Sequence, residues 1–164
     1  MTNLEFIQSK QIKDFKTLID ELPVELGNSF PRSMRNWCGL EPRPYPLTEW
    51  QIYLAILNKN IVGICSYYKQ QDDPLKRYWI GWIGVLKPWR KKGIGSTMIN
   101  FIEDKLCKLR ATESWVYTDK ENINAIEFYK SNNYIYKSEF KEIDIRQDGA
   151  NADSVVMTKK LCCN

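Results

Sequence analysis

The run Tyr78–Leu86 is apolar at nearly every position, and it constrains the fold more than any other part of the chain. A short apolar run that stops at a proline, here Pro88, predicts a strand buried on both faces. Such a strand lies in the interior of a sheet and needs covering layers on both sides. The chain is therefore expected to be an α/β protein built around a mixed sheet.

The remaining hydrophobic pattern predicts further strands and helices around this run. Strands are expected at Leu4–Gln8, Gln51–Leu57, Ile61–Tyr68, Ser114–Tyr117, Tyr134–Ile145 and Val155–Leu161. Amphipathic helices are expected at Gln11–Leu26, Ser96–Leu109 and Asn122–Asn132. The proline-rich segment Phe30–Leu47 is predicted to be irregular, with a short helical turn at Arg32–Trp37. This order predicts helices on both faces of a mixed sheet.

Bulk properties exclude several classes of protein. The 164 residues form one domain, 1–164, without an apolar run of membrane-spanning length or a secretory signal pattern. The five cysteines are odd in number and show no C-x-x-C spacing, which indicates reduced thiols and a cytoplasmic protein. Because the chain has no histidine, a His-based triad and a His-ligated metal are excluded, and no metal site is expected.

The turn after the apolar run combines three consecutive cations with two glycines and the start of a helix. Backbone amides at a helix N-terminus, with glycines that allow close approach, favour phosphate or pyrophosphate binding. The order Lys-Lys-Gly-Ile-Gly-Ser fails the Walker pattern, and Met98 takes the place of the third glycine of a dinucleotide fingerprint. What remains is R-x-x-G-x-G, formed by Arg90, Gly93 and Gly95. The alternative is an ordinary tight strand–helix turn.

A second motif follows about 30 residues downstream, beyond one predicted strand. Asn122, Ala125, Phe128 and Tyr129 fit N-x-x-A-x-x-F-Y, with Asn133 standing where a glycine is usual. Asparagine is the next-best residue for a left-handed helix end, so this departure is mild. The two motifs in this order resemble the GNAT superfamily of N-acetyltransferases, over roughly Ile52–Phe140. The resemblance implies a twisted mixed sheet of six to seven strands, flanked by about four helices.

The resemblance also implies a cofactor, acetyl-CoA, and residues that bind it. In that family two parallel strands splay apart, and the pantetheine arm of coenzyme A lies in the gap. Carried over, backbone groups of Val85 and Leu86 would meet the pantetheine, Arg90 would shape or charge the turn, and Asn122 would contact the cofactor arm. Amides for the pyrophosphate would come from Lys91, Lys92, Gly93, Ile94, Gly95 and Ser96.

The implied reaction is transfer of an acetyl group from acetyl-CoA to a primary amine, by direct attack in a ternary complex. The departing thiolate benefits from an acid, and the resemblance places Tyr129 near the thioester sulfur. A core tyrosine whose hydroxyl bonds a carbonyl is the alternative for this residue. The chain could also be an acyl-CoA-binding sensor without turnover. A base is not identified, and the candidates are Glu41, Glu49, Asp73 and Asp119.

The partner expected from this reasoning is a small-molecule or peptide amine. The family resemblance places Phe30–Trp50 beside the acceptor, where Trp37, Tyr45 and Trp50 could hold a cation or simply pack on the sheet. The net charge of +4 is modest and the cations of the turn are local, so no nucleic acid partner is expected. Pairing of Val155–Leu161 across two copies would give a homodimer.

Overall fold

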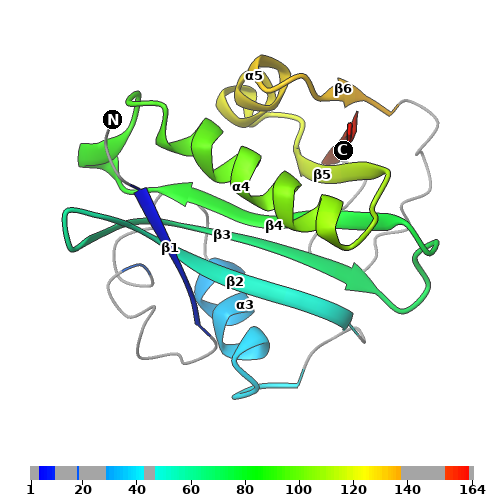
Figure 1. Cartoon of the computed structure of the whole chain (residues 1–164), viewed down its shortest axis with the longest axis horizontal. Coiled ribbons are helices and arrows are strands. Elements are labelled where there is room, and N and C mark those ends of the chain that lie inside the picture. The colour runs from blue at the N-terminus through cyan, green and yellow to red at the C-terminus, as the bar shows by residue number, and fades with distance from the viewer. Residues whose placement is uncertain (1–3, 10–17, 19–28, 43–46, 138–153, 163–164) are drawn as a thin grey trace.

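A central seven-stranded sheet organises the part of the chain that the structure, a computed structural model, describes: residues 4–9, 18, 29–42, 47–137 and 154–162. The strand order is β1-β2-β3-β4-β5-β7-β6 (Figure 1). The strands are β1 Leu4–Gln8, β2 Leu47–Leu57, β3 Asn60–Gln70, β4 Arg77–Val85, β5 Glu113–Asp119, β6 Ile135–Tyr136 and β7 Ser154–Lys160. The β4–β5 pair is parallel and the other pairs are antiparallel. The predicted mixed sheet is confirmed.

Three α-helices are present among the described residues: α3 Ser29–Trp37, α4 Ile94–Lys108 and α5 Ile123–Ser131. A short 3-10 helix, η2 Lys87–Trp89, precedes α4. The predicted helix Gln11–Leu26 lies outside the described residues except for Leu18, which is helical and buried. Likewise, the predicted strand Tyr134–Ile145 is described only up to residue 137. Within this part, Ile135–Tyr136 form the short strand β6.

Helices cover both faces of the sheet, as the sequence predicts. Helix α4 lies across β3 and β4 on one face (Figure 1), and its stripe from Met98 to Leu106 is fully buried against them. On the other face, Phe30 and Met34 of α3 pack against the β2 and β3 residues Ile52, Leu54 and Ile64. Strand β4 contributes to both cores, with Ile80 on the α4 side and Trp82 on the α3 side. Its predicted interior position is confirmed.

Helix α3 corrects one prediction about the proline-rich segment. The sequence predicts only a short turn at Arg32–Trp37, whereas the helix spans nine residues, Ser29–Trp37. Pro31 lies in the first turn, where its missing N–H removes no hydrogen bond of the helix and its fixed φ suits the helical backbone. Proline therefore excludes a helix interior at this point, but it does not exclude a helix start.

Two further observations bear on the expectations drawn from composition. Cys107 is disulfide-bonded, so the prediction of reduced thiols is wrong at this position. Cys38, Cys65 and Cys162 are not disulfide-bonded. Within the described ranges, no helix is both long and apolar enough to cross a membrane.

Candidate active site

Strands β4 and β5 are paired only at their beginnings. The parallel register joins Arg77 with Glu113, Tyr78 with Ser114 and Trp79 with Trp115, and pairing ends there. Strand β4 nevertheless continues to Val85 and β5 to Asp119. The sheet therefore has a gap between the second halves of two neighbouring strands, which we call the β4–β5 gap.

The register of β4 shows which of its backbone groups face this gap. The Leu86 amide donates to the Val62 carbonyl at 2.9 Å, so Val85 and Gly63 form a non-hydrogen-bonded pair of the antiparallel ladder. In such a pair each residue's own N–H and C=O point away from the partner strand. The backbone of Val85 consequently faces the gap. By the same alternation, Ile83, which is paired with Cys65, presents its backbone groups to the same side.

Leu86 differs from Val85, although the family resemblance assigns both to the pantetheine. Its amide is bonded to Val62, and its carbonyl accepts from the Trp89 amide at 2.8 Å. The backbone of Leu86 thus closes the end of β4 and starts η2. The Val85 carbonyl accepts a hydrogen bond from Nε of Arg90 at 2.8 Å, which ties the turn to the edge of the gap.

The turn after η2 presents backbone donors. Lys91 (φ 57°) and Gly93 (φ 77°) adopt left-handed conformations, and Gly93 is the N-cap of α4. Within the described chain, Thr97 is the first residue of α4 whose amide has a backbone acceptor, the Gly93 carbonyl at 3.0 Å. The amides of Ile94, Gly95 and Ser96 lie at the positive end of the helix dipole with no such partner.

Charge reinforces this arrangement. The first turn of α4 contains no acidic residue. The side chains of Lys87, Arg90, Lys91 and Lys92 are exposed around the turn, and Nζ of Lys92 lies 5.0 Å from the Trp89 ring centroid. Free amides together with several cations form a site suited to a phosphate or diphosphate.

The two sequence motifs meet in the structure. A Cβ added to Gly95 would come within 2.9 Å of the Phe128 ring, so only glycine fits there without a shift. The side chain of Asn122 caps α5 by accepting a hydrogen bond from the Ala125 amide at 3.2 Å. Asn133 has φ 67°, the left-handed conformation that the sequence predicts for this position. The second motif therefore packs directly on the turn that the first motif forms.

Tyr129 follows Phe128 on the buried side of α5. Its side chain is 7% exposed and contacts the rings of Phe128 and Tyr134, at centroid distances of 5.4 and 5.7 Å. Burial raises the pKa of the Tyr129 hydroxyl well above its ordinary value. The hydroxyl is therefore protonated at neutral pH.

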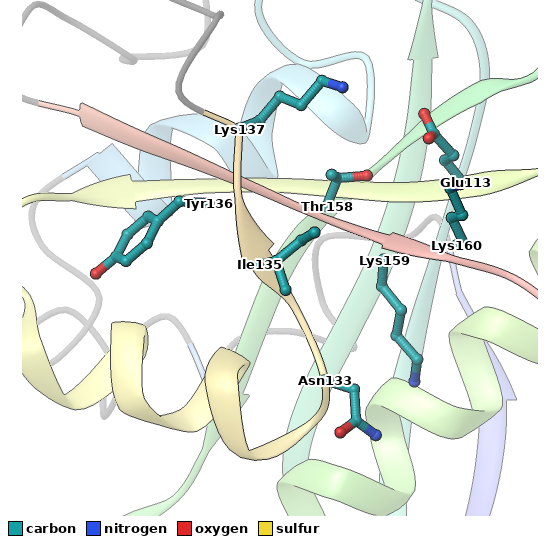
Figure 2. A pocket seen from close by; sticks show the side chains of 8 residues that line it. All are labelled: Glu113, Asn133, Ile135, Tyr136, Lys137, Thr158, Lys159 and Lys160. Carbon is teal, nitrogen blue, oxygen red and sulfur yellow. The ribbon is translucent and has the colours of Figure 1, made fainter.

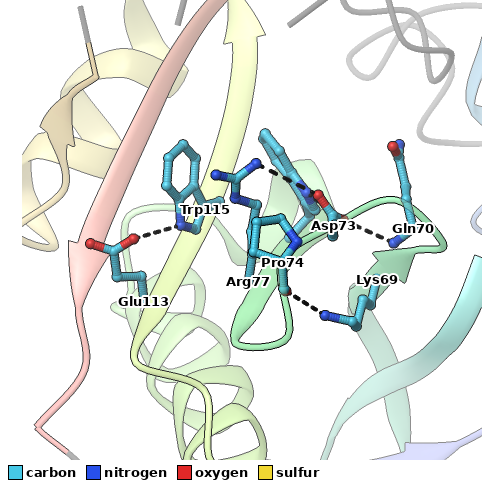
Figure 3. Close-up of polar contacts among 8 residues, drawn as sticks. Lys69, Gln70, Asp73, Pro74, Arg77, Glu113 and Trp115 are labelled. Atoms are coloured by element: carbon cyan, nitrogen blue, oxygen red, sulfur yellow. Dashed lines mark hydrogen bonds and ion pairs between the residues drawn. The ribbon is translucent and has the colours of Figure 1, made fainter. Parts of the chain in front are cut away.

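Three of the four candidate bases are bound to other residues of the fold. Asp73 holds the β3–β4 turn by accepting from the backbone amide of Gln70 (Figure 3). It also accepts from the Trp79 indole. Glu49 accepts from the Tyr78 hydroxyl at 2.7 Å, and burial together with this carboxylate raises the pKa of Tyr78 to about 12. Glu41 is paired with Arg35. Asp119, exposed at the end of β5, is the one candidate on a strand of the gap.

Aromatic side chains gather beside the gap on the face covered by α3. The ring centroids of Trp79 on β4 and Tyr117 on β5 are 6.3 Å apart, across the point where the strands separate. Trp37 of α3 and Trp50 of β2 are half-buried and 5.9 Å apart, and they pack against the same cluster. Of the three aromatic residues expected beside the acceptor, Tyr45 lies outside the described residues. The other two contact one another close to the cluster that borders the gap.

A separate hollow of about 490 Å³ lies at the edge of the sheet (Figure 2). It surrounds Ile135 and Tyr136 of β6 and the facing part of β7, and its other lining residues are Glu113, Asn133, Lys137, Thr158, Lys159 and Lys160. None of the residues predicted to bind the cofactor lines this hollow. The gap and the turn, rather than the hollow, carry the predicted site.

A strand gap with a cationic, amide-rich turn at its open end defines a fold that is shared with known enzymes. The model of the acetyltransferase (GNAT) family matches residues 17–134, and the chain belongs to this family. The resemblance drawn from the two motifs is thereby confirmed.

Particular relatives agree with this assignment. Over 99 residues the chain is 32% identical to N-alpha-acetyltransferase 30 of Dictyostelium discoideum, a match covering 55% of the chain and 54% of that protein. A solved acetyltransferase from Streptococcus agalactiae has a TM-score of 0.75 at 14% identity, and the match covers 98% of this chain and 100% of that protein's chain. A GNAT family acetyltransferase from Elizabethkingia anophelis, solved with acetyl-CoA bound, has a TM-score of 0.67 at 15% identity, covering 97% and 99% of the two chains.

Proposed function

We propose that the protein transfers an acetyl group from acetyl-CoA to an amine by direct attack in a ternary complex. The observation that carries the proposal is the β4–β5 gap with the Lys87–Ser96 turn beside its open end. Within the part of the chain that the structure describes, the backbone of β4 has no partner strand on this side beyond Trp79, although buried N–H and C=O groups need partners. An extended arm with amides of its own, such as pantetheine, satisfies that need.

The residues around the turn divide the work of holding the cofactor. The amides of Lys91, Lys92, Gly93, Ile94, Gly95 and Ser96 surround the diphosphate, and the lysine side chains add positive charge. Arg90 keeps the turn against β4 through the Val85 carbonyl. The backbone of Val85 pairs with the pantetheine, and Leu86 fixes the end of the strand. Asn122, whose Oδ1 caps α5, has its side-chain NH₂ left to donate to the cofactor arm.

Tyr129 is the proposed general acid. The amine nitrogen attacks the thioester carbonyl carbon, the C–S bond breaks, and the leaving thiolate takes the proton of the Tyr129 hydroxyl. The extra proton of the new amide nitrogen leaves to water, and the tyrosine is reprotonated from solvent. Burial keeps the phenol neutral before the transfer, so that it can donate its proton to the leaving thiolate.

The proposed acceptor is an α-amino group, as in a peptide N-terminus. The name of the Dictyostelium relative points to this class. Chemistry favours it as well: an α-amine has a pKa of about 8 and a lysine side chain one of about 10.4, so at neutral pH a far larger fraction of the α-amine is uncharged. Because Glu41, Glu49 and Asp73 are held elsewhere, an acceptor that needs little help from a base suits this site.

A direct test uses two matched peptides. One has a free N-terminus and no lysine, and the other has the same sequence with a blocked N-terminus and one internal lysine. Each peptide is incubated with acetyl-CoA, and the release of the coenzyme A thiol is measured. Mass spectrometry identifies the acetylated product. We expect turnover of the first peptide only. Turnover of the lysine peptide alone would overturn the acceptor class, and tight cofactor binding without turnover of any amine would indicate a sensor.

A further inference from the structure

Strand β4 is irregular where it begins to border the gap. Its ladder with β3 pairs Tyr67 with Ile80 and Cys65 with Ile83, so Ser66 alone faces both Gly81 and Trp82. One residue opposed by two is a β-bulge, which bends a strand and changes the direction of the groups that follow. We call this feature the β4 bulge.

Ser66 holds the β4 bulge from the neighbouring strand. Its side chain is fully buried (0% exposed), and Oγ accepts a hydrogen bond from the Trp82 amide at 2.7 Å. The same hydroxyl donates to the Trp82 carbonyl at 3.4 Å. A Cβ on Gly81 would lie 2.5 Å from this Oγ, so the glycine leaves the space that the hydroxyl occupies. The hydroxyl thus supplies hydrogen bonds that the ladder cannot supply at a bulge.

The β4 bulge decides which residues of β4 face the gap. Before it, the side chains of Tyr78 and Ile80 belong to the α4-side core, and after it those of Ile83 and Val85 pack there. Because of the extra residue, the side chains that face the α4-side core come from even-numbered positions before the bulge and from odd-numbered positions after it. The backbone groups of Ile83 and Val85 therefore face the gap, and a strand without the bulge would present its groups at other positions.

We propose that Ser66 is a positioning residue for cofactor binding, one that acts through the β4 bulge. By holding both polar groups of Trp82, it fixes the register in which Ile83 and Val85 offer N–H and C=O to the amides of the pantetheine arm. Ser66 lies on β3 and does not touch the cofactor. The inference rests on the proposed function, because it needs the arm to lie along β4.

The experiment compares Ser66→Ala with Ser114→Ala, a matched control. Ser114 is also fully buried (0% exposed) and loses a comparable hydrogen bond, 2.8 Å from the Tyr134 hydroxyl, but it lies on the paired part of β5. Calorimetry measures the binding of coenzyme A and of adenosine 3′-phosphate 5′-diphosphate, which is the nucleotide part of the cofactor without its arm. The nucleotide reports on the turn alone, and the difference between the two probes reports on the arm.

We expect Ser66→Ala to weaken coenzyme A about tenfold, which corresponds to ~1.4 kcal/mol, and to leave nucleotide binding within about twofold of the wild type. Ser114→Ala should leave both affinities within about twofold. Equal losses for both probes, or no loss beyond that of the control, would overturn the inference while the proposed function stands. If the wild-type protein binds neither probe, the proposed function itself fails.

A second variant covers the case in which Ser66→Ala does not fold. Ser66→Cys keeps a weaker acceptor in nearly the same volume, so it should bind coenzyme A with an affinity between those of the wild type and the alanine variant. Amide hydrogen exchange at Trp82 gives an independent readout, because it reports directly on the bond to Ser66. Exchange at Trp82 that is as slow in Ser66→Cys as in the wild type, together with weaker coenzyme A binding, would contradict the proposed route through the bulge.

Discussion

Two turns flank β4, and they are built in opposite ways. The β3–β4 turn closes on the buried carboxylate of Asp73, 4% exposed, which accepts from the Gln70 backbone amide and lies 3.9 Å from the Arg77 guanidinium (Figure 3). The same carboxylate accepts from the Trp79 indole. The turn between β4 and α4 contains no carboxylate. There the amides that open α4 have no backbone acceptor within the described residues, and the lysines around them are exposed.

One end of β4 therefore has a turn built for stability, and the other end has a turn built for binding. We call the β3–β4 turn the closed turn and the turn between β4 and α4 the open turn. Where the chain must only reverse direction, a buried acidic side chain satisfies the donors of the turn. Where an anion is to bind, the same kind of side chain would compete with it, so the donors stay free and the charges are all of one sign. Exposed cations repel one another in the absence of a ligand, and a bound diphosphate removes that repulsion.

The largest expected effect concerns Tyr129, which stands apart from both turns. Tyr129→Phe removes only the hydroxyl, so kcat should fall about 10²- to 10³-fold, as is typical when a general acid is lost. The affinity for coenzyme A should change less than about twofold, because the binding turn is untouched. Steady-state kinetics with the α-amine peptide and calorimetry with coenzyme A provide the two values. Tyr136→Phe, at an exposed tyrosine, is the control and should change neither.

The pH dependence gives an independent check on the same residue. Burial disfavours the phenolate and raises the pKa of Tyr129 above the ordinary value of 10.0. The acid form is therefore present throughout the range from neutral pH to about 10, and kcat should show no alkaline decline there. A decline of kcat with a midpoint near 9 that disappears in Tyr129→Phe would mean that the hydroxyl ionises more easily than this environment allows.

The next effect tests the closed turn. Asp73→Ala removes the acceptor that the Trp79 indole and the Gln70 backbone amide share, and it removes one partner of Arg77. We expect the free energy of unfolding to fall by about 3 kcal/mol, measured by urea denaturation. Coenzyme A affinity should stay the same at a temperature where the variant is folded. Asp72→Ala, which removes an exposed carboxylate next to it, should cost less than about 0.5 kcal/mol.

The open turn should respond in the reverse manner. Lys92→Gln removes one cation beside the amides of α4, so coenzyme A should bind roughly threefold to tenfold more weakly, with a smaller dependence on salt. The free energy of unfolding should barely change. Lys76→Gln, at an exposed lysine of the β3–β4 turn, should affect neither quantity. Equal weakening of binding by both variants would show that the whole protein's charge, rather than the turn, attracts the cofactor.

Sequence patterns predicted the features that depend on local residues. The central strand, the turn with Gly93 and Gly95, the α5 motif and the left-handed conformation at Asn133 all follow from residue types a few positions apart. The family resemblance added the prediction that two parallel strands splay apart, as β4 and β5 do. The length of α3 was underestimated because the prolines were given too much weight, although a proline in the first turn of a helix costs little.

Features that join distant segments were not predictable in this way. Asp73 was a candidate base on residue type alone, and only the fold shows that its carboxylate is used by Trp79. The β4 bulge lies at Gly81 and is held by Ser66, fifteen residues earlier in the chain. A single polar residue in the apolar run Ile61–Tyr68 was the one available signal for Ser66.

The smallest effect separates the two glycines of the open turn. Gly93 has φ 77° and no atom within 4 Å of an added Cβ, so Gly93→Ala should cost only the strain of a left-handed backbone, about 1 kcal/mol of the free energy of unfolding. Gly95→Ala meets Phe128 at 2.9 Å instead, and the added methyl group must displace the ring or the helix. Truncation by Phe128→Leu should therefore offset part of the cost of Gly95→Ala, while it should add independently to Gly93→Ala. Double-mutant cycles by urea denaturation measure both couplings. Equal coupling of the two glycines to Phe128 would mean that the turn moves as one unit, and that the closed and open turns differ less in rigidity than their hydrogen bonds indicate.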